Sequence, residues 1–270
     1  MPHRDLCDQE EASLPVAERT RQRSAVRTAV VWDALRRALD ERVAALVEPR
    51  LDVVDAGGGT GGFAVPLAEL GHTVTVVDPS PDALAILERR AAEAGVSERV
   101  RGVQGDVAGL PEVLRDGCCD VVLCHSVLEV VDDPGAAARA VTGVLRPAGL
   151  VSVLTANRAA AVLHRALLGR FDDARTAFTD PLGRWGAADP IPRRFTLPEL
   201  VDLLQGAGLQ VGPVHGVRVF ADLVPGSVLD ADPGALDALV ALEAAVAETP
   251  TYRDIATQLH VLAVRGRAPG

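Results

Sequence analysis

Lysine is absent from this sequence of 270 residues, which also contains only one methionine, one tyrosine and 3% aromatic residues. All 27 basic residues are therefore arginine, and we attach no function to this bias. Four cysteines occur, but they form no Cys-x-x-Cys pair, and adjacent Cys118 and Cys119 are poorly placed to share one metal. The sequence thus excludes a disulfide scaffold and predicts reduced, structural thiols without a metal.

Long apolar runs are missing as well. No window approaches the roughly 18 consecutive apolar residues that a transmembrane helix requires. Residues 1–15 contain no apolar core like that of a secretory signal peptide. With 48% hydrophobic and 24% charged residues, the composition is that of an ordinary globular protein. We therefore expect a cytoplasmic protein with no membrane partner.

Basic charge is in deficit, since the 27 arginines face 37 acidic residues and the net charge is −10. This balance argues against a protein that coats nucleic acid nonspecifically, but it leaves room for a local basic surface. Residues 156–195 have a local charge of +3, from Arg158, Arg165, Arg170, Arg175, Arg184, Arg193 and Arg194 against Asp172, Asp173, Asp180 and Asp189. This segment is either a nucleic-acid contact or a solvated loop.

The order of predicted elements indicates an α/β fold. Residues 1–24 are polar and aperiodic, which predicts a flexible tail. Apolar residues at helical spacing over residues 26–47 predict an amphipathic helix that ends at Pro49. Strands are then expected at 51–55, 73–78, 100–106, 120–125 and 149–156, and helices at 61–70, 81–95 and 134–145. This alternation predicts a Rossmann-like, doubly wound, mostly parallel sheet with helices on both faces.

The alternation breaks after Asn157. Residues 157–196 read as an insertion with two short helical stretches and a loop rich in Gly, Pro and Asp. The remaining expected elements are a helix at 196–208, a strand at 214–220, a helical segment at 234–248 and a strand at 258–266. The two late strands bring the sheet to seven, one of them antiparallel, within a single domain over residues 25–265.

The most specific motif is a glycine-rich loop that follows the first strand. It reads Asp-Ala-Gly-Gly-Gly-Thr-Gly-Gly over residues 55–62 and satisfies the GxGxxG pattern with Gly57, Gly59 and Gly62. Glycine lets the backbone turn sharply and approach a ligand closely. Asp78 ends the second strand, where its carboxylate can accept hydrogen bonds from a ribose. The pattern predicts a nucleotide-type cofactor.

Three further features favour S-adenosylmethionine over a nicotinamide or flavin cofactor. Asp55, two residues before Gly57, suits a cationic amino group better than a phosphate, because like charges repel. Asp106 follows the third strand, where it can accept a hydrogen bond from an adenine amino group. The segment Leu-Arg-Pro-Ala-Gly at 145–149 forms the turn expected before the fifth strand. A dinucleotide site and a glycine turn without a ligand are the alternatives.

These residues resemble the class I S-adenosylmethionine-dependent methyltransferases over residues 50–156. Longer strings at 25–35, 124–134, 216–224 and 251–265 resemble the tRNA 5-carboxymethoxyuridine methyltransferases. The chain departs from that pattern at three places. Val130 stands where an aromatic residue is expected, Ala148 replaces a glycine, and Arg193-Arg194 replaces a stretch rich in lysine.

The resemblance implies a role for each matching position. In chain order, Arg27 would contact the cofactor carboxylate, Gly57 and Gly58 the methionine portion, Asp78 the ribose, Asp106 and Val107 the adenine, and His125 the methyl-donor end. A solvated helix charge is the alternative for Arg27, and a buried structural histidine is the alternative for His125.

The resemblance further implies methyl esterification of the carboxymethoxy group on the wobble uridine of tRNA. A carboxylate with a pKa near ~4 is already ionised at neutral pH, so this acceptor needs no general base. Arginine can orient it through paired hydrogen bonds, which makes Arg218 the first candidate and Arg193 and Arg194 the others. An ion pair with Asp222 is the alternative for Arg218. A small-molecule O- or N-methyltransferase and a non-catalytic S-adenosylmethionine-binding protein are the rival functions.

Overall fold

A computed structural model describes residues 16–44, 49–232 and 234–266, with the side chains of residues 16–27, 230 and 231 outside the description. Helix α1 (Val16–Val43) begins earlier than predicted, so residues 16–24 are helical and not part of a tail. The prediction relied on apolar spacing, whereas this stretch contains three Arg together with Ala, Glu and Gln, which favour a helix without an apolar stripe. Residues 1–15 lie outside the described part.

One seven-stranded sheet organises the chain, in the order β3-β2-β1-β4-β5-β7-β6. The strands are β1 (Asp52–Ala56), β2 (Thr73–Asp78), β3 (Val100–Gln104), β4 (Cys119–His125), β5 (Leu145–Ala156), β6 (Leu209–Val217) and β7 (Gln258–Arg265). The first five are parallel, and β7 runs antiparallel to both β5 and β6. The predicted doubly wound sheet with one antiparallel late strand is confirmed.

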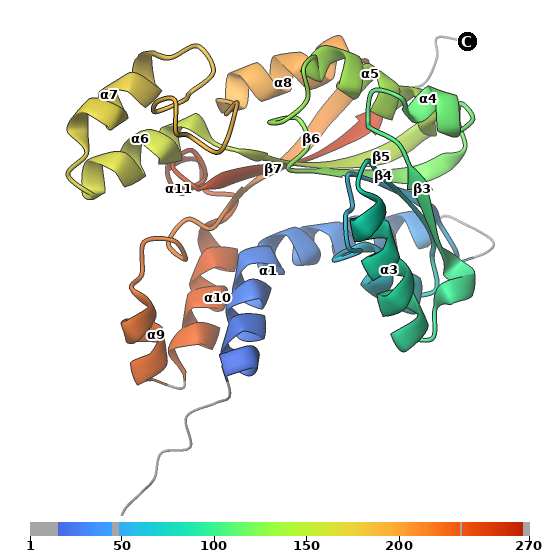
Figure 1. Ribbon diagram of the computed structural model, residues 1–270, viewed down its shortest axis with the longest axis horizontal. Helices are drawn as coiled ribbons and strands as arrows, with labels where there is room; N and C mark the ends of the chain where they lie inside the picture. The colour runs from blue at the N-terminus through green and yellow to red at the C-terminus, as the bar shows by residue number, and fades with distance from the viewer. Residues whose placement is uncertain (1–15, 45–48, 233, 267–270) are drawn as a thin grey trace, which may run out of the picture.

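Helices cover both faces of the sheet (Figure 1). They are α2 (Ala64–Glu69), α3 (Pro81–Glu93), α4 (Leu110–Val113), α5 (Pro134–Val144), α8 (Leu197–Gly206) and α1. On one face, Leu35 of α1 and Leu87 of α3 pack in a buried cluster with Leu123 of β4. On the other, α5 and α8 pack on Val122 and its neighbours. Because side chains of a strand alternate between faces, β4 supplies both cores.

The insertion after β5 folds as α6 (Arg158–Leu167), α7 (Phe171–Thr179) and a loop that ends at Phe195. The two ends of the insertion meet, because the Arg158 N–H donates to the Phe195 carbonyl at 3.0 Å and Asn157 bridges to Phe195. In Figure 1 this unit lies beyond the C-terminal end of β5, beside α11 (Pro250–Arg253). It therefore lies at the carboxyl ends of the parallel strands, where ligands bind in doubly wound folds.

The segment between β6 and β7 contains α9 (Gly226–Ala231), α10 (Ala235–Val246) and α11. Helix α10 packs against α1, and the two lie side by side in Figure 1. Among the helices of the described ranges, none is long and apolar enough to cross a membrane.

Candidate functional site

The glycine loop after β1 is held in a shape that only glycine permits. Gly57 and Gly59 have φ values of +74° and +54°, in the left-handed region. A Cβ on Gly57 would lie 2.5 Å from Val127 Cγ2, and one on Gly58 would lie 2.4 Å from Asp55 Oδ2. The backbone thus passes directly over the side chains at the ends of β1 and β4. The sharp turn expected from the motif is present, and close approach to a ligand stays a prediction.

Asp78 ties this loop to the end of β2. Its Oδ2 accepts the Gly59 N–H at 2.9 Å, and its Oδ1 accepts the Ser80 N–H at 2.9 Å. Each carboxylate oxygen has a further lone pair, so the group can still accept hydrogen bonds from a diol. The side chain is almost fully buried. Asp78 is therefore a fixed acceptor beside the loop.

Asp55 is a buried acid whose carboxylate has no paired cation in the described part of the chain. The residue is 3% exposed, and its carboxylate makes no hydrogen bond within the part of the chain whose side chains are described. Burial, and secondarily the charge of Asp78, raises the pKa of Asp55 to about 7. A buried carboxylate is costly unless it is paired. The site thus suits an ammonium donor and disfavours a phosphate.

The other predicted cofactor residues are Asp106 and Val107 after β3 and Arg27 on α1. Asp106 follows β3 and is exposed, with Oδ1 accepting the Gly109 N–H at 2.7 Å, which leaves Oδ2 for a ligand. The Val107 side chain packs in the core against Leu110, so only its backbone can face a ligand. Arg27 lies on α1, but its side chain is outside the description.

His125 ends β4 under aromatic cover. Its Nε2 lies 2.8 Å from Ser152 Oγ, and its ring meets Phe63 edge-on with centroids 4.7 Å apart. Burial lowers the pKa of His125 to about 4, so the imidazole is neutral at pH 7. Its Nδ1 is buried without a hydrogen-bond partner in the described ranges. An imidazole of this kind can accept a hydrogen bond, but it is a weak general base.

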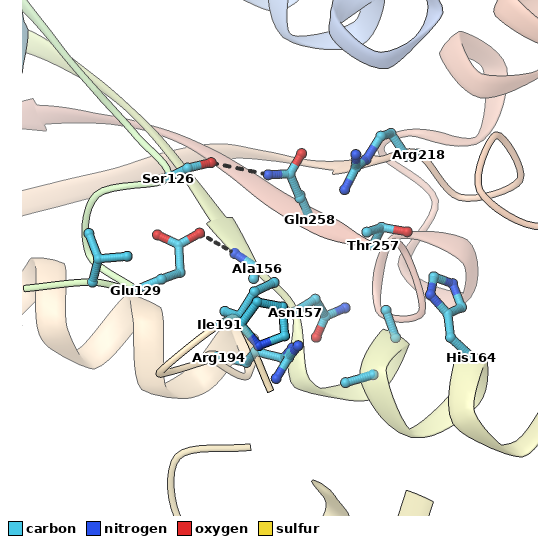
Figure 2. A pocket seen from close by; sticks show the side chains of 14 residues that line it. Ser126, Glu129, Ala156, Asn157, His164, Ile191, Arg194, Arg218, Thr257 and Gln258 are labelled. Carbon is cyan, nitrogen blue, oxygen red and sulfur yellow. Dashed lines mark hydrogen bonds between the residues drawn. The ribbon is translucent and has the colours of Figure 1, made fainter. Parts of the chain in front are cut away.

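A cavity of about 330 Å³ begins at Ser126, the residue after His125 (Figure 2). Gln258 closes one wall and donates to Ser126 Oγ at 3.3 Å. Glu129 lies on the other side, with Oε1 accepting the Ala156 N–H at 2.7 Å. Burial raises the pKa of Glu129 to about 7. The cavity therefore adjoins the predicted methyl-donor end and is lined by polar groups. The sequence analysis missed Glu129.

Arg218 lines this cavity and also pairs with Asp222, its Nε lying 3.3 Å from Asp222 Oδ2. Figure 2 shows its side chain beside Gln258 and Thr257. The expected strand stops at Val217 because Arg218 adopts φ +59°. Arg218 thus both lines the cavity and forms the ion pair with Asp222, so its geometry agrees with either predicted role.

The loop that carries Arg218 is fixed by a residue that the sequence analysis missed. Glu243 of α10 is 1% exposed and accepts the N–H groups of Val219, Phe220 and Ala221, each at 2.8 Å. Three charge-assisted hydrogen bonds make this a strong attachment. An acid inside the apolar run at 235–246 was the available signal.

Arg193 and Arg194, the other candidate clamps, both form hydrogen bonds within the protein. Arg194 is buried and forms a two-pronged pair with Asp189 at 2.6 and 3.0 Å. Arg193 donates to the Val131 carbonyl at 2.8 Å. Arg194 thus braces the insertion internally, and Arg193 ties the insertion to the segment that follows β4. Arg194 also lines the cavity that contains Arg218, so a role of this pair in orienting an acceptor stays a prediction, with Arg218 as the first candidate.

Comparison with known proteins gives a consistent family. Residues 54–153 match a family model described as a methyltransferase domain. The chain is 31% identical over 239 residues to a tRNA 5-carboxymethoxyuridine methyltransferase of Escherichia coli K12, which covers 88% of this chain and 87% of that protein. It is 34% identical over 168 residues to a ubiquinone biosynthesis O-methyltransferase of Xanthomonas euvesicatoria, covering 61% and 65%.

Solved structures share the fold at low identity. An S-adenosylmethionine-dependent methyltransferase from Methanosarcina mazei has a TM-score of 0.58 at 17% identity, covering 84% of this chain and 98% of that one. The cyclase SpnF has a TM-score of 0.54 at 21% identity, covering 86% and 81%. Since the fold also occurs in a cyclase, the chemistry has to be argued from the site.

Proposed function

This chain belongs to the class I S-adenosylmethionine-dependent methyltransferases, and we propose that it forms a methyl ester on the carboxymethoxy group of wobble uridine in tRNA. The observation that carries the proposal is the guanidinium of Arg218 in a cavity next to the end of β4. A planar guanidinium orients a planar carboxylate through paired hydrogen bonds. The reaction named for the E. coli relative has such an acceptor.

The residues around the glycine loop fit the cofactor. We assign the methionine ammonium to Asp55, since that carboxylate is buried without a partner in the described structure. We assign the ribose to Asp78, and the methionine portion to the backbone of Gly57, Gly58 and Gly59. A Cβ on Gly57 or Gly58 would clash, and Gly59 has a positive φ. The adenine falls to Asp106 Oδ2 and the Val107 backbone. His125 closes the methyl-donor end, and Arg27 remains the proposed partner of the cofactor carboxylate.

Positioning supplies most of the catalysis in this proposal. Bound S-adenosylmethionine supplies an electrophilic methyl group on a sulfonium. Arg218 would hold the acceptor carboxylate in the cavity and orient it toward that methyl group. His125 and its Phe63 cover exclude water from the methyl-donor end. No proton has to be removed, because the acceptor is already an anion at pH 7.

Substitution of Gly58 by alanine tests the cofactor assignment. The new Cβ would lie 2.4 Å from Asp55 Oδ2 and displace that carboxylate. We expect Gly58→Ala to weaken binding of S-adenosylhomocysteine by about 10²-fold or more, a cost of at least ~2.7 kcal/mol, as measured by calorimetry. Gly62→Ala is the matched control, because a Cβ there meets nothing within 4 Å. Equal affinity in both variants would contradict the assignment.

The acceptor is tested directly by tRNA nucleosides. We expect purified protein to convert carboxymethoxyuridine in tRNA to its methyl ester in the presence of S-adenosylmethionine, as read by mass spectrometry. The same nucleoside should lose its ester in cells without the gene. Retention of the ester in such cells would overturn this choice of acceptor.

Binding of tRNA should be modest and sensitive to salt. In the insertion, the side chains of Arg170 and Arg175 are 57% and 78% exposed, and Phe171 of the same segment is exposed as well. If three or four phosphates are neutralised, log K falls against log[salt] with a slope of about −2 to −4. Replacing Arg170 and Arg175 with Ala should reduce the steepness of that slope by about 1 to 2.

Arg89 provides the control for this measurement, because it is similarly exposed but lies on helix α3, outside the insertion. Arg89→Ala should leave the slope unchanged. A slope that is equal in all three proteins would exclude the insertion as the tRNA contact.

A small-molecule O-methyltransferase is the second candidate. It is favoured by the partial match to the ubiquinone biosynthesis enzyme and by the size of the cavity, about 330 Å³. A hydroxyl acceptor has to lose a proton, so its rate should depend on a base. The pH dependence of turnover therefore separates the two candidates.

A further inference from the structure

Three buried polar side chains, Ser152, His260 and His215, form a continuous row behind His125. Strand register aligns His125 with Leu154, Leu154 with His260, and His260 with His215, across β4, β5, β7 and β6. Residues in register project from the same face of a sheet. Ser152 lies on that face too, two residues before Leu154. The antiparallel insertion of β7 thus brings three histidines from distant parts of the sequence into one line.

Hydrogen bonds connect the buried side chains of the row, and an electrostatic contact continues it to Glu248. Ser152 Oγ lies 2.8 Å from His125 Nε2 and 2.8 Å from His260 Nε2. The chain continues from His260 Nδ1 to His215 Nδ1 at 3.3 Å. His215 Nε2 then lies 3.6 Å from Glu248 Oε1, whose side chain is 65% exposed. The row therefore runs from the end of β4 to the protein surface.

The charge of Glu248 sets the direction of these hydrogen bonds. A carboxylate only accepts, so His215 carries its proton on Nε2 and presents a lone pair at Nδ1. His260 then donates from Nδ1 and accepts at Nε2 from the Ser152 hydroxyl. That hydroxyl oxygen accepts from His125 Nε2–H. The reverse direction would place a lone pair of His215 against the carboxylate.

Each histidine in the row is neutral at pH 7. Burial lowers the pKa of His125 to about 4, and it lowers the pKa values of His260 and His215 as well. Arg37 and Asp33 of α1 are the other charges near the His215 end, and they pair with each other at 3.2 Å. A neutral imidazole has two tautomers, and its hydrogen-bond partner selects between them.

We propose that Ser152, His260, His215 and Glu248 are positioning residues that hold His125 in its Nε2–H tautomer, so that its Nδ1 lone pair accepts a hydrogen bond from the ammonium group of bound S-adenosylmethionine. His125 Nδ1 is buried and unpartnered in the described part of the structure. His125 and Asp55 end neighbouring strands on the face that α1 covers, since Asp55 pairs with Leu123. The inference depends on the cofactor placement proposed above.

The tautomer of His125 can be read directly from ring-nitrogen NMR of the full chain. The protein has 6 histidines, and His125→Phe identifies the signals of interest. We expect a protonated Nε2 and an unprotonated Nδ1 in the wild-type protein without ligand. Ser152→Ala should give a mixture of tautomers and weaken S-adenosylhomocysteine binding about three- to tenfold, the range of one hydrogen bond. Glu248→Ala should change the tautomer ratio and the affinity in the same direction as Ser152→Ala, but by a smaller amount.

Thr155→Val is the matched control, because Thr155 is a fully buried hydroxyl of the same strand with no partner in the described chain. It should leave the tautomer and the affinity unchanged. A purely structural role would lower the melting temperature of Ser152→Ala without moving either readout, and this result would overturn the relay. Protonated Nδ1 in the wild type would overturn it as well. Failure of the wild type to bind S-adenosylhomocysteine would instead overturn the cofactor placement, whatever the tautomer.

Discussion

Replacing Asp55 with Asn is expected to abolish most cofactor binding and to stabilise the protein without ligand. Removing one partner of a buried charge pair costs about 3 to 5 kcal/mol, so affinity for S-adenosylhomocysteine should fall by at least ~10². Calorimetry measures this loss. Asp52→Asn is the control, because Asp52 begins the same strand but pairs with Arg146 at 2.8 Å, away from the loop. It should bind as the wild type does.

The gain in stability follows from the pKa of Asp55, which rises from 3.8 to about 7 on folding. A raised acid pKa means that the folded state favours the protonated form. The associated stability is complete below about pH 3.8 and is lost as the pH rises through 7. At about pH 8, Asp55→Asn should therefore raise the free energy of unfolding by roughly 1 to 4 kcal/mol. Thermal unfolding without ligand measures it.

The same titration makes cofactor binding depend on pH. An ammonium group binds the carboxylate form, so affinity of the wild type should rise up to about tenfold per unit between pH 5.5 and 7, and then level off. Asp55→Asn should show no such rise. A flat profile in the wild type, or a variant that binds normally, would show that Asp55 does not hold the ammonium.

Much of this site was predictable because its signals are local. The alternation of strand and helix alone predicts that the loop at 55–62 and Asp78 lie together at the carboxyl ends of two parallel strands. The same alternation predicted the parallel part of the sheet, β1 to β5. Helix α1 began earlier than predicted because helix propensity, unlike core packing, leaves no apolar stripe.

Contacts between distant segments were not predictable. Ser152, His260 and His215 meet only because β7 is inserted antiparallel between β5 and β6. Glu243 reaches Arg218's loop from a helix whose packing on α1 the sequence does not reveal. A count of arginines likewise cannot show that Arg194 forms a buried ion pair with Asp189. Register and pairing decide these roles, and both are properties of the folded chain.

Arg218→Lys is expected to lower turnover by about 10² or more while cofactor affinity stays unchanged. Lysine keeps the charge but loses the paired geometry that a guanidinium offers a carboxylate. The backbone conformation is not the cause, because φ +59° is equally unfavourable for both unbranched side chains. The loop itself remains held by Glu243. Turnover is measured per folded molecule, with tRNA or a carboxylate model acceptor.

Asp222→Asn separates the two roles of Arg218. It removes the ion pair to Nε, 3.3 Å away, and leaves the guanidinium in the cavity. If Arg218 orients the acceptor, Asp222→Asn should keep most of the turnover that Arg218→Lys loses. If the pair only braces the loop, both variants should lose thermal stability alike and retain a similar rate per folded molecule. The second result would remove Arg218 from the site.

The pH profile of turnover then identifies the acceptor. A carboxylate acceptor titrates near ~4, so kcat at saturating cofactor should be flat from about pH 6 to 9. His125 cannot introduce a slope in this range, because burial holds its pKa at about 4. Glu129 lines the cavity and has a pKa of about 7, so the profile is measured in Glu129→Gln as well as in the wild type. A kcat that climbs tenfold per pH unit would require a hydroxyl or amine that ionises during the reaction. The ester-forming mechanism would then be wrong, and the cavity beside Arg218 would belong to a small-molecule acceptor.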